Sequence, residues 1–293
     1  MVDKIAKKDL GILLKESWDF FSKRWVVLFQ ITLFVWIPVL MAFPLAGFLW
    51  TSYYSLQKNN PELLFSFKVI LAGGILFFTL IGIFTAALLM DKLIKVTIID
   101  GLWKKPEEKY YLDFFKLIKD VWPKMGEFCK TQVLAWLVIF PGPLLLFAFG
   151  VFFLGTKMTL EEAMTLSLPL LTPGVLFYIW FSFVPYEVIL RGKKGKDALS
   201  SSKGIVRYDL AKFAGNMLVI IGILLFINMG LSGFLKLVFS FFNSTALLNL
   251  GELIATIVSN IFGLWGTVFH FSLYRDLRDR YPGAKAGILE PLP

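Results

Sequence analysis

The sequence has very little of the side-chain chemistry on which most enzymes depend. Its 293 residues include one cysteine, Cys129, and one histidine, His270. One cysteine excludes an intrachain disulfide, and the pair argues against a zinc centre, which needs three or four converging ligands. Neither a GxxxxGK[ST] nor a GxGxxG phosphate-binding loop is present. We therefore expect no metal, no cofactor and no catalytic activity.

Charge is also scarce, and the way it is distributed argues against a nucleic-acid partner. Charged residues make up 17% of the chain, against about 25% in a typical soluble domain. The mean hydropathy is +0.71. The net charge of +9 could suggest nucleic-acid binding, but the basic residues flank long apolar runs, as they do in membrane-protein loops.

The apolar residues form six runs that are long enough to cross a bilayer as helices, which requires about 20 residues each. The first run is too long for a signal peptide, so we expect it to remain in the membrane. The sequence therefore predicts one all-α, polytopic membrane domain over 1–293. The six expected transmembrane helices are 25–50, 69–90, 131–154, 167–190, 214–235 and 248–271.

Basic residues orient this bundle. Six of the 30 Lys and Arg precede the first run, nine lie in 91–130, seven in 191–213 and four after 271. The alternate connections hold only Lys58, Lys68, Lys157 and Lys236. Because cytoplasmic loops are enriched in Lys and Arg, we expect both termini on the cytoplasmic side of the cell (inner) membrane.

Three amphipathic segments each precede a pair of spans. They cover about 10–25, 111–125 and 197–213, with apolar residues every three or four positions and Lys or Arg opposite. Asp197 is a candidate N-cap of the third, and Pro123 is expected to kink or restart the second. We expect all three to lie in the headgroup region, either only anchoring the protein or also binding anionic lipid. The chain then divides into three pseudo-repeat units, 1–90, 91–190 and 191–293.

The sixth expected span carries small residues at every fourth position, which is typical of a helix-packing groove. Such a groove allows close backbone approach, so it should seat another helix of this chain, a protein partner or a second copy. Its members are Gly251, Ala255, Ser259, Gly263 and Thr267.

Ionisable and amide groups at membrane depth are candidate functional residues. Glu187 lies one turn before the end of the fourth run, and Arg191 at i+4 is its expected ion-pair partner. Asn228 and Asn260 could bond between helices, and His270 is expected at the interface. Prolines also interrupt the third and fourth spans, as they do around some transporter sites, so a site among spans three to five is an alternative.

The stretch FVPYEVILRGKKGKDALSSSKGIVRYDLAKFAGN, 183–216, resembles a group of prokaryotic six-span proteins. That group includes the membrane domain that accompanies some glycerophosphodiester phosphodiesterases, and related uncharacterised inner-membrane proteins. Two further stretches are similar to that group. One is LLKESWDFFSKRW near the start, which resembles the helix that leads into the group's first span, and the other is LYRDLRDR at 273–280, which resembles the segment that follows its last span. The resemblance implies a membrane domain without the phosphodiesterase barrel, so no catalytic residues are carried over.

Three functions fit these features to different degrees. The first is a non-enzymatic membrane protein in a scaffold, assembly or lipid-interacting role, with membrane lipids as partners. The second is a transporter or permease subunit with a site among spans three to five. The third and weakest is an intramembrane lipid enzyme. A polar cavity near Glu187 and Asn228 would favour transport, and a solid centre would favour a scaffold.

Overall fold

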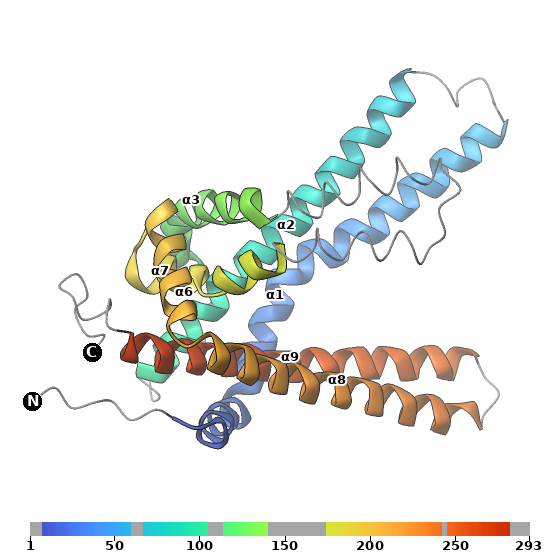
Figure 1. Cartoon of the computed structure of the whole chain (residues 1–293). Coiled ribbons are helices and arrows are strands. Elements are labelled where there is room, and N and C mark those ends of the chain that lie inside the picture. The colour runs from blue at the N-terminus through green and yellow to red at the C-terminus, as the bar shows by residue number, and fades with distance from the viewer. Residues whose placement is uncertain (1–7, 60–66, 105–113, 140–173, 242–244, 282–293) are drawn as a thin grey trace, which may run out of the picture.

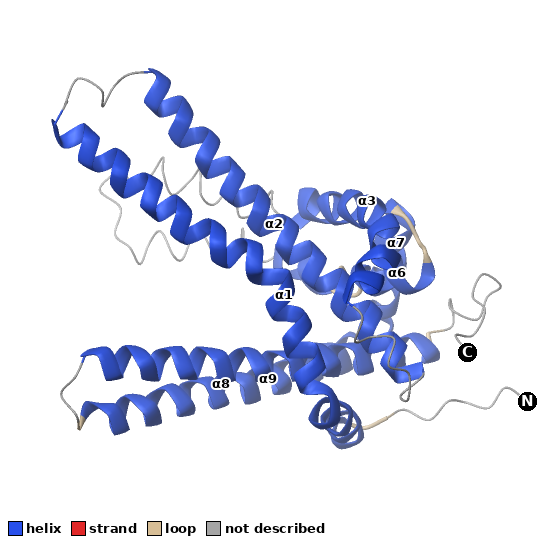
Figure 2. Cartoon of the chain, turned by 180° about the vertical axis from the view of Figure 1, so that it is seen from behind, coloured by secondary structure: helices blue, strands red, loops and turns tan. Residues whose placement is uncertain are grey.

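The computed structural model describes residues 8–59, 67–104, 114–139, 174–241 and 245–281, and every regular element in these ranges is helical. Two long helical hairpins extend from a compact group of shorter helices and diverge from each other (Figures 1 and 2). The described part of the chain begins and ends at that compact group (Figure 1).

The first hairpin pairs α1 (Leu10–Asn59) with α2 (Phe67–Lys104). The N-terminal part of α1 runs in a different direction from the rest, so that it lies across the base of the molecule (Figure 1). The helix nevertheless continues without a break through Pro38 and Pro44.

The second hairpin pairs α8 (Leu210–Ser240) with α9 (Thr245–Arg280). Its base is joined to α7 (Gly195–Tyr208) at Asp209, whose side chain accepts a hydrogen bond from the Lys212 amide at 3.3 Å. This bond satisfies one of the free N–H groups that open α8.

Between the hairpins lie α3 (Phe114–Ile139), a helical stretch at 174–180, and α6 (Val184–Arg191). We call the compact group at the base the head. It comprises the start of α1, the end of α2, α3, α6, α7, the start of α8 and the end of α9.

One hydrophobic core runs through the head and draws on every element of it. Its largest fully buried side chains come from segments far apart in the sequence. They include Leu13, Leu93, Ile98, Phe128, Phe183, Phe269, Phe271 and Tyr274. The hairpin shafts instead expose large apolar side chains, among them Leu40, Met41, Phe226 and Met229. This division suits shafts that lie inside the hydrocarbon.

Four helical segments are long and apolar enough to cross a membrane, judged by length and composition. They are Leu10–Ile37, Gly174–Arg191, Leu210–Ser240 and Leu247–Arg280. The chain is thus compatible with a multi-pass membrane protein. Most of the third expected span and the first part of the fourth lie outside the described residues.

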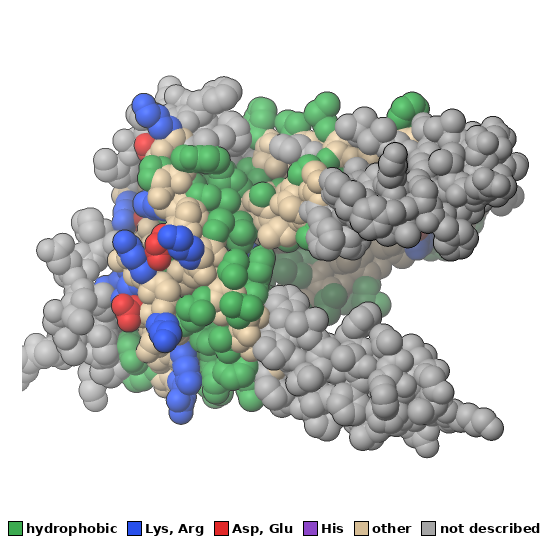
Figure 3. Space-filling view, turned by 90° about the horizontal axis from the view of Figure 1, so that it is seen from above, with side chains coloured by type: hydrophobic (Ala, Val, Ile, Leu, Met, Phe, Trp, Pro, Cys, Tyr) green, Lys and Arg blue, Asp and Glu red, His purple; other side chains and the backbone are tan. Residues whose placement is uncertain are grey.

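Charged side chains gather at one end of the molecule, beside a band of hydrophobic ones (Figure 3). The charged end is the head. This arrangement follows from the clustering of Lys and Arg between alternate apolar runs.

The structure corrects the expected position of the amphipathic segments. The apolar face of α7 is buried in the protein: Ala198, Leu199, Ile205 and Val206 are at most 8% exposed. Leu13 on α1 and Val121 on α3 are also fully buried. These parts of the three faces are buried against other helices of the protein, because an amphipathic pattern specifies an apolar neighbour without specifying which one. Trp18 and Trp122 on the same segments stay exposed.

Two local expectations were also wrong. The segment 10–25 is continuous with the following span, and only α7 is a separate helix. The N-cap of α7 is Lys194, without a side-chain capping bond, and Asp197 lies in the first turn. Of the two outcomes expected at Pro123, a kink or a restart, the restart does not occur, because α3 continues through it.

Candidate functional site

The carboxylate of Glu187 in the head is completely buried and has three polar partners. Its Oε1 accepts a hydrogen bond from the Tyr274 hydroxyl at 2.7 Å. Its Oε2 accepts one from the Ser201 hydroxyl at 2.6 Å and pairs with the Lys193 ammonium at 3.0 Å. Both oxygens are therefore satisfied, and α6, α7 and α9 meet on a single side chain.

A tight turn after α6 makes this arrangement possible. Gly192 caps the helix with φ 64°, a left-handed conformation that glycine adopts without steric cost. The amides of Gly192 and Lys193 then bond back to Val188 O and Glu187 O, both at 3.1 Å. The chain reverses, so Lys193 and the first turns of α7 face the carboxylate of α6.

The sequence had suggested a different partner for Glu187. The ion pair that the structure shows is with Lys193, not with Arg191 at i+4. Ser201 and Tyr274 were not foreseen, because they lie 14 and 87 residues from Glu187. The only local hint was the glycine pair that encloses Lys193.

His270 lies beside this network. Its Nδ1 is 2.9 Å from the Tyr186 hydroxyl, and its ring is 5.0 Å from that of Phe183. Tyr186 in turn stacks on Tyr274, with ring centroids 4.8 Å apart. The histidine thus sits within an aromatic cluster that joins α6 to α9.

A second charged cluster joins the C-terminal end of α9 to α8 and to the N-terminal segment. The Asp276 carboxylate pairs with the Lys212 ammonium at 2.6 Å and with Arg280 at 2.7 Å. Lys212 also donates to the backbone oxygen of Lys8, whose amide donates to Asp276 Oδ1 at 3.3 Å. The side chains of Lys212 and Asp276 are 6% and 2% exposed, so this pair is almost fully desolvated.

Asp91 on α2, just past the expected second span, pairs with Lys95 at 2.6 Å. Burial raises the pKa of its carboxyl above the usual value, against the opposing effect of Lys95. Burial also lowers the pKa of the neighbouring Lys92. Within the described ranges, no group of three or more His, Cys, Asp or Glu is placed to hold a metal ion.

The small residues of α9 are divided between two environments. Gly251 packs on α8, where a Cβ would lie 2.5 Å from the Phe239 ring. Ala255 is buried, and the Ser259 hydroxyl donates to Asn228 Oδ1 at 2.8 Å. A Cβ at Gly263 would meet nothing within 4 Å, and the hydroxyl of Thr267 bonds to its own helix at Gly263 O.

The remaining candidates do not converge on one site. Asn228 and Ser259 bond across the shafts of α8 and α9, away from Glu187, and Asn260 is exposed. Four of the prolines behind the transporter hypothesis, at 141, 143, 169 and 173, lie outside the described residues. The fifth, Pro185, lies in the first turn of α6. The site seen here is therefore a set of internal polar clamps in the head.

Comparison with family models, with curated proteins and with solved structures found no match to this chain.

Proposed function

We propose that this chain is a non-enzymatic integral membrane protein that acts as a scaffold or assembly factor through its head. The observation that carries the proposal is the use made of buried charge. Glu187 and Asp276, with their partners, hold α6, α7, α8 and α9 together, and their carboxylates are occupied by protein groups. A catalytic carboxylate would instead be directed toward a space that admits substrate.

In this proposal six helices cross the cell (inner) membrane, and the head lies on its cytoplasmic face with both termini. The 26 Lys and Arg of the head-side segments, against four in the alternate connections, support that orientation. Exposed cations of α7, such as Lys196 and Arg207, are available for anionic headgroups or an acidic partner.

The test is purification of the full chain in mild detergent, followed by identification of co-purifying proteins. A scaffold should retain a defined protein, and K196E/R207E should release it without changing the unfolding midpoint. The matched control is K236E, which reverses an exposed charge at the opposite end of the molecule. Retention of the same protein by all variants, or no defined protein with wild type, would contradict the proposal.

A transporter or permease subunit is the second candidate, with a site among spans three to five, of which the third and fourth contain prolines. Glu187 was its candidate charged group, and three partners now occupy that carboxylate. Substrate-dependent stabilisation that is lost on changing Asn228 would support transport instead. An intramembrane lipid enzyme remains the weakest candidate.

A further inference from the structure

A row of cations runs along one side of α7. Its members follow one another at intervals of seven and four residues, which places them on the same face of a helix, and they are Lys196, Lys203 and Arg207. At 1.5 Å per residue this α7 row is about 16 Å long. Among the described residues, no carboxylate pairs with Lys203 or Arg207. The row therefore has positive charge that the head does not neutralise by direct contact.

One indole ring lies beneath the C-terminal end of the α7 row. The Lys203 Nζ is 4.6 Å from the centroid of the Trp180 ring, and the Arg207 guanidinium carbon is 5.8 Å from it. The Ser202 hydroxyl holds the two helices together here, because it donates to the backbone oxygen of Trp180 at 2.7 Å. This end of the row therefore faces the helical stretch 174–180, and the ring keeps the two cations close to each other.

The stretch beneath the row leads into the membrane. It belongs to Gly174–Arg191, one of the four segments that are long and apolar enough to cross a bilayer. Its side chains Val175, Leu176 and Tyr178 are exposed. Figure 1 shows α7 running across the direction of the α8–α9 hairpin, so α7 would lie parallel to the plane of a bilayer around that hairpin. The cations are then level with lipid phosphates and beside a surface that suits acyl chains.

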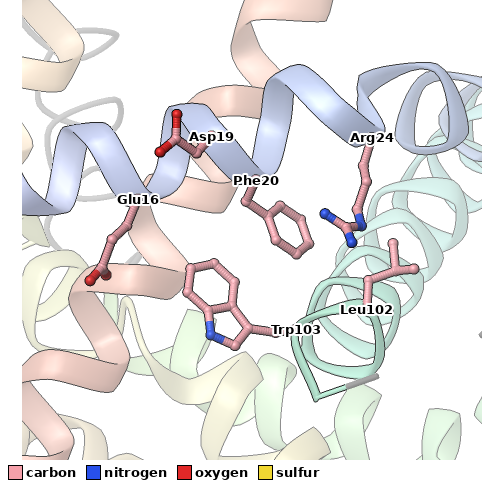
Figure 4. A pocket seen from close by; sticks show the side chains of 6 residues that line it. All are labelled: Glu16, Asp19, Phe20, Arg24, Leu102 and Trp103. Atoms are coloured by element: carbon pink, nitrogen blue, oxygen red, sulfur yellow. The ribbon is translucent and has the colours of Figure 1, made fainter. Parts of the chain in front are cut away.

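A groove between the start of α1 and the end of α2 provides a contrast (Figure 4). A cation also lies over a ring there, because the Arg24 guanidinium carbon is 5.0 Å from the centroid of the Phe20 ring. The lining of that groove also includes the acidic residue Glu16. A phosphate would meet charges of both signs in the groove, whereas Lys203 and Arg207 present charge of one sign.

We propose that the α7 row and Trp180 bind the headgroup of an anionic phospholipid, such as phosphatidylglycerol, in the cytoplasmic leaflet. Lys203 and Arg207 donate hydrogen bonds to the phosphate oxygens, and the acyl chains lie along Val175 and Leu176. The ring covers only one side of each cation, so the other side remains for the phosphate. A zwitterionic lipid would bring its own ammonium toward these cations, so net negative charge is favoured. The inference rests on the proposed membrane position of the head and does not require a protein partner.

The experiment measures lipid binding by the full chain in detergent, using native mass spectrometry with dioleoyl phosphatidylglycerol, phosphatidylethanolamine or phosphatidylcholine. We expect phosphatidylglycerol to bind about tenfold more tightly than either of the others. Lys203→Gln combined with Arg207→Gln should weaken its binding about 25-fold, because each cation near an anionic headgroup contributes about a factor of five. The matched control is Lys119→Gln with Lys130→Gln, which removes the same charge from exposed positions on α3.

A second pair of variants tests the ring. Trp180→Phe keeps an aromatic face beneath the cations and should retain most of the binding, whereas Trp180→Leu should weaken it about fivefold. Unfolding midpoints without lipid identify any misfolded variant. If the double variant misfolds, Lys203→Gln alone decides the outcome, with an expected loss of about fivefold.

Two results would overturn the proposal on lipid binding alone. They are equal binding of the three lipids by wild type, and equal losses in the double variant and its α3 control. A third is the loss of a co-purifying protein from the double variant while phosphatidylglycerol binding stays unchanged, because the row would then be a protein-docking surface. Lipid binding and protein retention are separate measurements, so the lipid site and the scaffold role can each fail without the other.

Discussion

Replacing Glu187 by alanine should destabilise the head strongly. The substitution removes the acceptor for the Tyr274 and Ser201 hydroxyls and leaves the Lys193 ammonium without its counter-charge. Removing one partner of a buried ion pair typically costs about 3–5 kcal/mol. Glu187→Gln keeps the shape and one acceptor oxygen, so its expected cost is smaller, about 1–3 kcal/mol.

The assay is unfolding of the purified protein in mixed micelles with increasing SDS, followed by tryptophan fluorescence. Trp180 and Trp265 both contact the head core, so their emission reports its packing. The matched control is Glu252→Ala. Glu252 pairs with Lys236 at 3.1 Å, but both side chains are more than half exposed, and such a pair contributes about 0–1 kcal/mol.

A double-mutant cycle separates the pair term from general damage. Tyr274→Phe alone removes one hydrogen bond to Glu187, and combined with Glu187→Gln it should cost less than the sum of the two changes. If Glu187→Ala and Glu252→Ala lower the free energy of unfolding by the same amount, the clamp does not hold the head together and the reasoning fails.

Three further predictions concern the shafts, the orientation and the single thiol. Gly251→Ala should destabilise the α8–α9 hairpin by about 1–3 kcal/mol, because a Cβ would lie 2.5 Å from the Phe239 ring, whereas Gly222→Ala has open space and should be neutral or stabilising in the same unfolding assay. Reporter tags inserted after residues 59 and 157 should be found outside the cytosol and tags at both termini inside it; two internal tags in the cytosol would contradict the threading. Burial raises the pKa of the Cys129 thiol, so maleimide should label it at pH 7 more slowly than a free thiol, and denaturation in SDS should remove the difference.

The helical class was predictable because apolar runs of the required length have few alternatives in a bilayer. The clustering of charge at one end was predictable for a similar reason, since the runs alternate in direction. What the pattern could not settle was the neighbour of each amphipathic face. Leu13, Val121 and Val206 would look the same in the sequence whether they met lipid or, as the structure shows, were buried inside the protein.

The polar clamps of the head could not be predicted from residues that lie close together in the sequence. Arg191 was the obvious partner for Glu187 because i+4 spacing brings side chains together on one helix. The left-handed turn at Gly192 ends that helix after Arg191 and brings Lys193 back to the carboxylate instead. Tyr274 arrives from an element 87 residues away, and no pairwise pattern in one sequence indicates such a contact.

The contact of small residues on α9 with another helix was predicted, but which of these residues make the contact was predicted only in part. Gly251 and Ser259 do contact α8, through Phe239 and Asn228 respectively. Residues spaced four apart shift gradually around a helix that has 3.6 residues per turn. The small residues therefore no longer face α8 by Gly263. Gly266 is there instead, where a Cβ would lie 2.8 Å from Leu224.

The contact between α1 and α9 limits when folding of the head can be completed during synthesis. Ser17 on α1 accepts a hydrogen bond from the indole of Trp265 on α9, across 248 positions. At a translation rate of about 5–20 residues per second, α1 waits on the order of tens of seconds for that partner to leave the ribosome. During that interval the face of α1 around Ser17 lacks its partner on α9, so a nascent chain arrested before α9 should be the form that chaperones and quality-control proteases engage.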